Sequence, residues 1–263
     1  ADTILSGAEP IYIPLNPPDF GFDADVLEDS FKNGAKALIL CNPSNPCGKV
    51  FTRDELQTIA DLVIKYDAYV ITDEVYEHIV YAPYRHTYIA TLPGMKERTI
   101  QCSSLSKTYS ITGWRLGYVI ADEGITDRVK KVHDFLTVGA AAPLMEAAVV
   151  GLNFKDEYYL ELQRHYTHMK ELFLGGLSQI GLTYTEPQGA YYVLVDISEF
   201  NCNNDLEFCE WLAREVGVGA VPGSSFFHHN TNQFIRFHFA KKDETLNMAL
   251  DRLSNIYSKA KKL

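Results

Sequence analysis

Residues 37–76 read "ALILCNPSNPCGKVFTRDELQTIADLVIKYDAYVITDEVY", a segment in which two short apolar runs flank a helical pattern. The runs "ALILC" (37–41) and "YVIT" (69–72) predict buried strands. Between them Thr52 and Glu55 have the spacing of a capping box. Apolar residues then recur at helical spacing, at Leu56, Ile59, Ala60 and Val63. A strand, a helix and a second strand in this order predict a parallel pair joined by a crossover helix.

Similar short apolar runs occur on both sides of this segment. Further strands are predicted at "IYIPL" (11–15), "TIQC" (99–102) and "LGYVIA" (116–121). The apolar runs are continuous rather than alternating, which is typical of a sheet covered on both faces. The sequence therefore predicts an α/β domain with a mostly parallel sheet.

After Gly181 the pattern changes to that of a smaller α+β domain. Helical spacing predicts helices at about 125–138, 143–152 and 156–177, and the last of these joins the two parts. Strands are predicted at "AYYVLVDI" (190–197) and "FIRFHFA" (234–240), with helices near 205–216 and 243–258. We expect a large domain over residues 1–155 and a smaller one over 156–263.

Composition limits the possible partners. The chain has 263 residues and a formal net charge of -10, which argues against nucleic acid or an anionic membrane as the main partner. No apolar stretch approaches the ~20 residues of a spanning helix. The five cysteines are odd in number and show neither a CxxC pair nor zinc-finger spacing, so we expect reduced thiols and a cytoplasmic location. The eight histidines show no ligand spacing, so we expect no metal site.

Polar residues follow the predicted strands of the first domain. Ligands of open α/β sheets bind beyond the carboxyl ends of the strands, so these residues are expected at one edge of one sheet. Arg115 can reach the same region across the turn that follows Lys107. The candidate residues after the strands are Asn45, Asp73, Tyr76, Ser104 and Lys107.

The chemistry of this set narrows the ligand. A serine hydroxyl and an arginine suit a phosphate, and a lysine among cations can form a Schiff base with an aldehyde. An aspartate can keep a ring nitrogen protonated, while an amide and a phenol can hydrogen-bond a phenolic oxygen. Phosphate, aldehyde, basic ring nitrogen and phenol together describe pyridoxal 5'-phosphate (PLP).

Several motifs carry a family resemblance over essentially the whole chain. They are "NPSNPCGKVFTRDEL", "ITDEVYEHIVY", "IATLPGMKERTI", "SSLSKTYSITGWRLGY", "PQGAYY", "VPGSSF" and "FIRFHFA". The sequence resembles the PLP-dependent class I/II aminotransferases, in particular the branch of kynurenine and bacterial aspartate or aromatic aminotransferases. This resemblance implies the aspartate aminotransferase-like fold, a homodimer, and transfer of an amino group from an L-α-amino acid to a 2-oxo acid.

The resemblance also implies a role for each matching residue. Lys107 would be the Schiff-base lysine and proton shuttle, and Asp73 would pair with the ring nitrogen. Asn45 and Tyr76 would hydrogen-bond the ring oxygen. Ser104 and Arg115 would bind the phosphate, and Arg236, with Asn45, would hold the substrate α-carboxylate.

Alternatives remain open at this point. Asn45 also suits a Pro-bounded turn, Tyr76 the core, and Arg236 the outward face of a strand. We expect the chain to lack the family's N-terminal portion, including a phosphate-binding loop and an aromatic residue stacked on the cofactor. A PLP-dependent carbon–sulfur β-lyase, or an inactive fragment or regulatory module of the same fold, would share the surviving motifs.

Overall fold

The computed structural model describes residues 2–228 and 231–260, and the chain forms two compact units. The first unit comprises Ala1–Asn42, Phe51–Glu77 and His86–Phe154. The second comprises Pro43–Val50, His78–Arg85 and Lys155–Leu263. Two short segments from the first half of the sequence thus group with the second unit. The domain boundary predicted after residue 155 stays a prediction.

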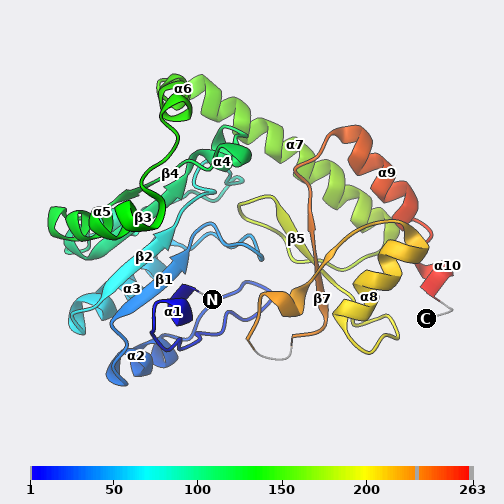
Figure 1. The fold of residues 1–263 in the computed structure, drawn as a ribbon. Helices are drawn as coiled ribbons and strands as arrows, with labels where there is room; N and C mark the ends of the chain where they lie inside the picture. The colour runs from blue at the N-terminus through cyan, green and yellow to red at the C-terminus, as the bar shows by residue number, and fades with distance from the viewer. Residues whose placement is uncertain (1, 229–230, 261–263) are drawn as a thin grey trace. The chain divides into compact units, whose positions relative to one another are not determined.

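The first unit contains a four-stranded sheet in the order β1-β2-β3-β4, seen side by side in Figure 1. Its strands β1, β2 and β3 are parallel, while β4 pairs antiparallel with β3. The strands are β1 (Ala37–Cys41), β2 (Tyr69–Asp73), β3 (Thr99–Ser104) and β4 (Gly117–Ile120). The α/β class and the mostly parallel sheet are confirmed.

Helix α3 (Arg53–Lys65) begins at the predicted capping box. Thr52 Oγ1 accepts the Glu55 N–H at 3.2 Å, and the Thr52 N–H donates to Glu55 Oε2 at 2.8 Å. The apolar stripe of α3 is buried in a core that also includes Leu40 of β1 and Val70 of β2. The remaining helices of this unit are α1 (Asp2–Leu5), α2 (Ala24–Lys32), α4 (Leu105–Thr108), α5 (Glu123–Thr137) and α6 (Ala142–Leu152).

Two features of the first unit differ from the sequence prediction. Residues 11–15 form no strand, because Pro14 and the following Pro17 and Pro18 lack the N–H groups that a ladder needs. The helix α2 was not predicted. Its signals are an Asp23 cap, whose Oδ1 accepts the Asp25 N–H at 2.8 Å, and the buried apolar residues of its inner face.

The expectation of a sheet covered on both faces does not hold at its two edge strands, β1 and β4. On β1, Leu40 is 6% exposed whereas its neighbour Ile39 is 58% exposed. Successive side chains of a strand point to opposite faces, so α2 and α3 cover one face at β1 and leave the other open. At the edge strand β4, Ile120 is likewise exposed.

The second unit contains a three-stranded antiparallel sheet in the order β5-β7-β6. The strands are β5 (Tyr192–Asp196), β6 (Val221–Pro222) and β7 (Phe234–His238), and the helices are α7 (Asp156–Ile180), α8 (Asp205–Trp211), α9 (Asp243–Leu253) and α10 (Ile256–Ala260). The predicted helix at 205–216 is α8 followed by a π-helical turn, and the closing helix is divided into α9 and α10.

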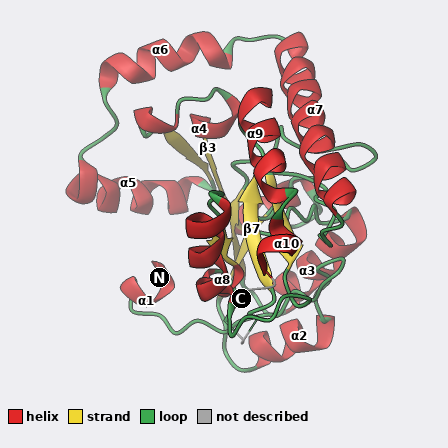
Figure 2. Ribbon diagram, turned by 90° about the vertical axis from the view of Figure 1, so that its right-hand side faces the viewer, coloured by secondary structure: helices red, strands yellow, loops and turns green. Residues whose placement is uncertain are grey.

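In the first unit a loop connects helix α5 to helix α6, as Figure 2 shows. In the second unit the ring of Phe173 on α7 packs edge-on against Phe237 on β7, with ring centroids 5.8 Å apart. None of the helices in the described part of the chain is both long and apolar enough to cross a membrane.

Candidate active site

Three predicted site residues lie at the carboxyl edge of the first unit's sheet. Asp73 is the last residue of β2, and Ser104 is the last residue of β3. In the register of the sheet, Asp73 pairs with Cys102 of β3. Ser104 lies two residues further along β3, or about 7 Å beyond this pair. Lys107 follows in the one-turn helix α4 and is partly buried. The structure thus brings a carboxylate, a hydroxyl and an amine to one end of the sheet.

A hydrogen-bonded loop connects Ser104 with Arg115. Ser104 Oγ accepts the Ser106 N–H at 3.0 Å and caps α4. Thr112 Oγ1 donates to the Ser106 carbonyl at 3.2 Å, and Arg115 Nη1 donates to the Thr112 carbonyl at 3.0 Å. These hydrogen bonds therefore hold together the loop 104–115, which carries Lys107 and has a predicted phosphate ligand at each end.

Arg115 has an unusual backbone. Its φ is 56°, in the left-handed region that is costly for a residue with a side chain. Its guanidinium is exposed and can donate in a planar fork. A strained residue held at the end of a ligand loop is typical of functional sites.

Gly117 allows β4 to approach β3 closely beside Ser104. A Cβ at this position would lie 2.9 Å from the Ser103 carbonyl oxygen and 3.6 Å from Ser104 Cα. Both are backbone atoms of the neighbouring strand, so they can give way only if the strand moves. The glycine therefore permits β4 to pack closely against β3 beside Ser104.

Replacing Gly117 with alanine is expected to lower the free energy of unfolding by about 1–3 kcal/mol, because β3 has to shift. Urea denaturation measures this change. Gly113→Ala is the matched control, since a Cβ at Gly113 meets nothing within 4 Å. Equal midpoints for the two variants would contradict the close approach.

The turn after β2 holds Asp73 and Tyr76. The Val75 N–H donates to Asp73 Oδ1 at 3.2 Å, and the Asp73 side chain is otherwise exposed to solvent. Tyr76 is only 3% exposed, so its phenol lies in the interior. Next to Asp73, the buried Glu74 lies 3.7 Å from the His86 imidazole. The side chains of Glu74 and Tyr76 thus pack inside the protein, whereas the carboxylate of Asp73 is exposed to solvent.

Glu77 is a residue that the sequence interpretation missed. Its Oε1 accepts from Ser103 Oγ at 2.9 Å and from Tyr118 Oη at 2.9 Å, and its Oε2 accepts from Tyr88 Oη at 2.8 Å. Burial, followed by the charge of Glu77, raises the pKa of the Tyr88 phenol. Burial also raises the pKa of Tyr118 to about 12, and the negative charge of Glu77 adds to this.

The raised pKa of Tyr118 predicts alkaline destabilisation. The contribution of the un-ionised Tyr118 to the free energy of unfolding is fully present below the ordinary tyrosine pKa of 10. It is lost as pH rises toward about 12, because Tyr118 ionises at a lower pH in the unfolded state than in the folded state. The free energy of unfolding should therefore fall between pH 10 and 12, less steeply in Tyr118→Phe than in the wild type. Urea titrations at closely spaced pH values measure both slopes, and identical slopes would contradict the assignment.

Asn45 and Arg236 lie together in the second unit. Arg236 Nη1 donates to Asn45 Oδ1 at 2.6 Å. The guanidinium carbon lies 4.3 Å from the ring centroid of Tyr192 and 4.3 Å from that of Phe226. Two aromatic faces and an amide therefore fix the orientation of the cation. The two rings were not predicted, because only the fold brings them to Arg236.

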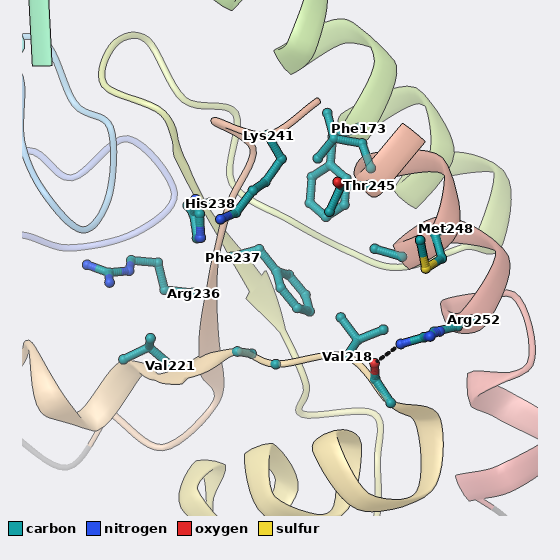
Figure 3. Close-up of a pocket in the computed structure, with 15 residues that line it drawn as sticks. Phe173, Val218, Val221, Arg236, Phe237, His238, Lys241, Thr245, Met248 and Arg252 are labelled. Carbon is teal, nitrogen blue, oxygen red and sulfur yellow. Dashed lines mark hydrogen bonds between the residues drawn. The ribbon is translucent and has the colours of Figure 1, made fainter. Parts of the chain in front are cut away.

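A cavity of about 380 Å³ in the second unit lies between β7, α9 and the segment 217–221. Figure 3 shows that Arg236 and Phe237 point to opposite sides of β7, and that Phe237 points toward this cavity. Arg252 closes one end by donating to the Gly217 carbonyl at 2.7 Å. The cavity is mainly apolar. Arg236 contributes to its lining, whereas Asn45, Tyr192 and Phe226 do not.

The residues of the first unit fit a PLP molecule by their chemistry. Ser104 and Arg115 supply a hydroxyl and a cation for a phosphate, Lys107 supplies an amine for an aldehyde, and Asp73 supplies a carboxylate for a ring nitrogen. Because Gly117 has no Cβ, the backbone of β4 can lie close beside Ser104. Within residues 2–228 and 231–260, no group of three or more His, Cys, Asp or Glu is arranged to hold a metal ion.

Comparisons with known proteins agree with this chemistry. A sequence profile of the family described as "Aminotransferase class I and II" matches residues 2–253. Kynurenine–oxoglutarate transaminase 3 of Homo sapiens is 36% identical, over 93% of this chain and 61% of the relative. Methionine aminotransferase of Escherichia coli is 34% identical, over 96% of this chain and 66% of the relative. The chain thus spans less than two thirds of the length of these two relatives.

Solved structures give the same result for the fold. The N-succinyldiaminopimelate aminotransferase of Mycobacterium tuberculosis superposes with a TM-score of 0.91 at 34% identity, covering 96% of this chain and 67% of that structure. Aminotransferases of this class depend on PLP. The chain belongs to the class I and II aminotransferase family.

Proposed function

We propose that the protein transfers the amino group of an L-α-amino acid to a 2-oxo acid with PLP as cofactor. The observation that carries this proposal is the placement of Asp73, Ser104 and Lys107 at one carboxyl edge of the sheet. The family membership supports it. The relatives are named for kynurenine, methionine and N-succinyldiaminopimelate.

The proposed roles divide between binding and proton transfer. When bound, PLP supplies an aldehyde that condenses with amines and a protonated ring that withdraws electrons from the substrate α-carbon. Asp73 would keep the ring nitrogen protonated. The family resemblance assigns Asn45 and Tyr76 to the ring oxygen, and the burial of the Tyr76 side chain favours a packing role for that residue. Ser104 and Arg115 hold the phosphate by a hydroxyl and a forked guanidinium.

Lys107 acts as the base and the acid of the reaction. Its Nζ would remove the proton from the substrate α-carbon and would later act as the proton donor, a role that requires a positioned amine. Arg236 binds the α-carboxylate of the substrate, and the rings of Tyr192 and Phe226 hold its guanidinium plane for this purpose. Two half-reactions of this kind produce ping-pong kinetics.

The test is an assay of the complete gene product with PLP, a panel of L-amino acids and a 2-oxo acid acceptor. We expect formation of the matching 2-oxo acid and double-reciprocal plots with parallel lines. Release of pyruvate and ammonia from cystathionine without an acceptor would instead indicate the carbon–sulfur β-lyase. Uptake of PLP without transfer from any amino acid would indicate the regulatory module.

We also propose a homodimer in the cytoplasm. The support for a dimer is the apolar surface of α5, where Phe135 is 91% exposed and Leu136 is 75% exposed. The support for a reducing compartment is that no disulfide joins any of the five cysteines, all of which lie within the described residues. Light scattering after gel filtration measures the mass, and a monomer at micromolar concentration would contradict the dimer.

A further inference from the structure

We propose that Glu77 is a positioning residue, whose carboxylate fixes the turn after β2 relative to the adjoining ends of β3 and β4. This inference rests on the proposed function, because the turn and the strand ends carry the candidate PLP ligands. Glu77 itself does not belong to that ligand set. It acts through the hydroxyl groups that it binds.

The two hydroxyls on Oε1 come from neighbouring positions of the sheet. Ser103 and Tyr118 are register partners of the antiparallel pair β3–β4. Ser103 directly precedes Ser104, and Tyr118 directly follows Gly117, where a Cβ would lie only 2.9 Å from the Ser103 carbonyl oxygen. A single carboxylate oxygen thus joins both strands at the place where the loop of Lys107 begins and ends.

The backbone of Glu77 closes the turn that carries Asp73 and Tyr76. Its N–H donates to the Glu74 carbonyl at 2.9 Å, while the Glu74 N–H donates to the Cys102 carbonyl of β3 at 2.9 Å. The turn is therefore held to β3 at its start by the backbone and at its end by the carboxylate. Loss of the carboxylate frees the end of the turn.

Tyr88 provides an internal control for this arrangement. Its phenol donates to the second oxygen of the same carboxylate at 2.8 Å, a bond of almost the same length as the other two. It lies in the segment before η1 (Ile89–Thr91), which carries none of the candidate ligands. Removing the Tyr88 hydroxyl costs one hydrogen bond of the network without freeing β3, β4 or the turn.

The test compares Glu77→Leu, Glu77→Gln and Tyr88→Phe in the complete gene product. Glu77→Leu leaves three hydroxyls without their acceptor, and we expect it to weaken the affinity for PLP about tenfold. Glu77→Gln keeps one carbonyl acceptor and is expected to restore most of this loss. Tyr88→Phe is expected to change the affinity less than twofold, although it lowers the melting temperature. The affinity is measured by quenching of protein fluorescence.

A second readout does not depend on the cofactor. Hydrogen exchange of PLP-free protein should be faster in Glu77→Leu at residues 73–77 and 103–118, and unchanged there in Tyr88→Phe. In the PLP-bound protein, the pH at which the visible absorption band changes should shift in Glu77→Leu alone, because that band reports the surroundings of the ring.

The inference is overturned if Glu77→Leu and Tyr88→Phe have the same PLP affinity and the same exchange pattern, since Glu77 would then contribute only to stability. A wild-type protein that binds no PLP would contradict the proposed function. In that case the exchange comparison still decides whether Glu77 fixes the turn.

Discussion

Lys107→Ala is expected to lower the rate of amino transfer at least about 1,000-fold, because the variant loses both the amine that bonds to the aldehyde and the base at the α-carbon. Lys107 lies in α4 directly after β3, beside the capping residue Ser104. A base placed in this way is worth several orders of magnitude in rate. Single-turnover kinetics with saturating amino acid measure the effect on the chemical step.

The control for this prediction is another lysine of the same unit. Lys130 lies on α5, and its side chain is 72% exposed. Lys130→Ala should retain the wild-type rate. If Lys107→Ala also retained it while remaining folded, the assigned base would be wrong.

Arg236→Leu is expected to lower kcat/KM for an α-amino acid about 100-fold, because the substrate carboxylate loses a charged, two-point hydrogen-bond partner. Asn45, Tyr192 and Phe226 hold the guanidinium in place, so the cation is ordered before a ligand binds. Arg236→Lys should recover only part of the loss, since an ammonium ion cannot donate in a planar fork. Steady-state kinetics with the preferred amino acid measure the loss.

A substrate analogue separates this role from a structural one. An amine with the same side chain but no α-carboxylate should react equally slowly with wild type and Arg236→Leu. Arg214→Leu, at an exposed arginine of the same unit, should behave as the wild type with both substrates. A loss in Arg236→Leu that is equal for the acid and the amine would contradict carboxylate binding.

The sequence predicted the elements of the first unit where local rules are strong. The apolar run 37–41 forms β1 with the bounds expected, and the Thr52–Glu55 capping box starts α3. The prediction failed at residues 11–15, where a continuous apolar run is typical of a strand but prolines prevent pairing. The antiparallel direction of β4 depends on the loop geometry at 105–116, which periodicity does not encode.

The candidate site was predicted residue by residue, but its supporting contacts were not. Glu77 and Tyr118 are 41 positions apart, and Asn45 and Arg236 are 191 apart. Contacts of this kind follow from strand order and register rather than from local composition. Glu77 follows Tyr76 in the sequence "DEVYE", yet only the structure shows that its carboxylate accepts hydrogen bonds from three hydroxyl groups.

Covalent trapping tests the central assignment most directly. The complete gene product is incubated with PLP, treated with borohydride to make any carbon–nitrogen bond permanent, digested, and analysed by peptide mapping. We predict that the pyridoxyl group will be found on Lys107, in the peptide that contains "SSLSK". A label on any other lysine, or on none, would contradict this account.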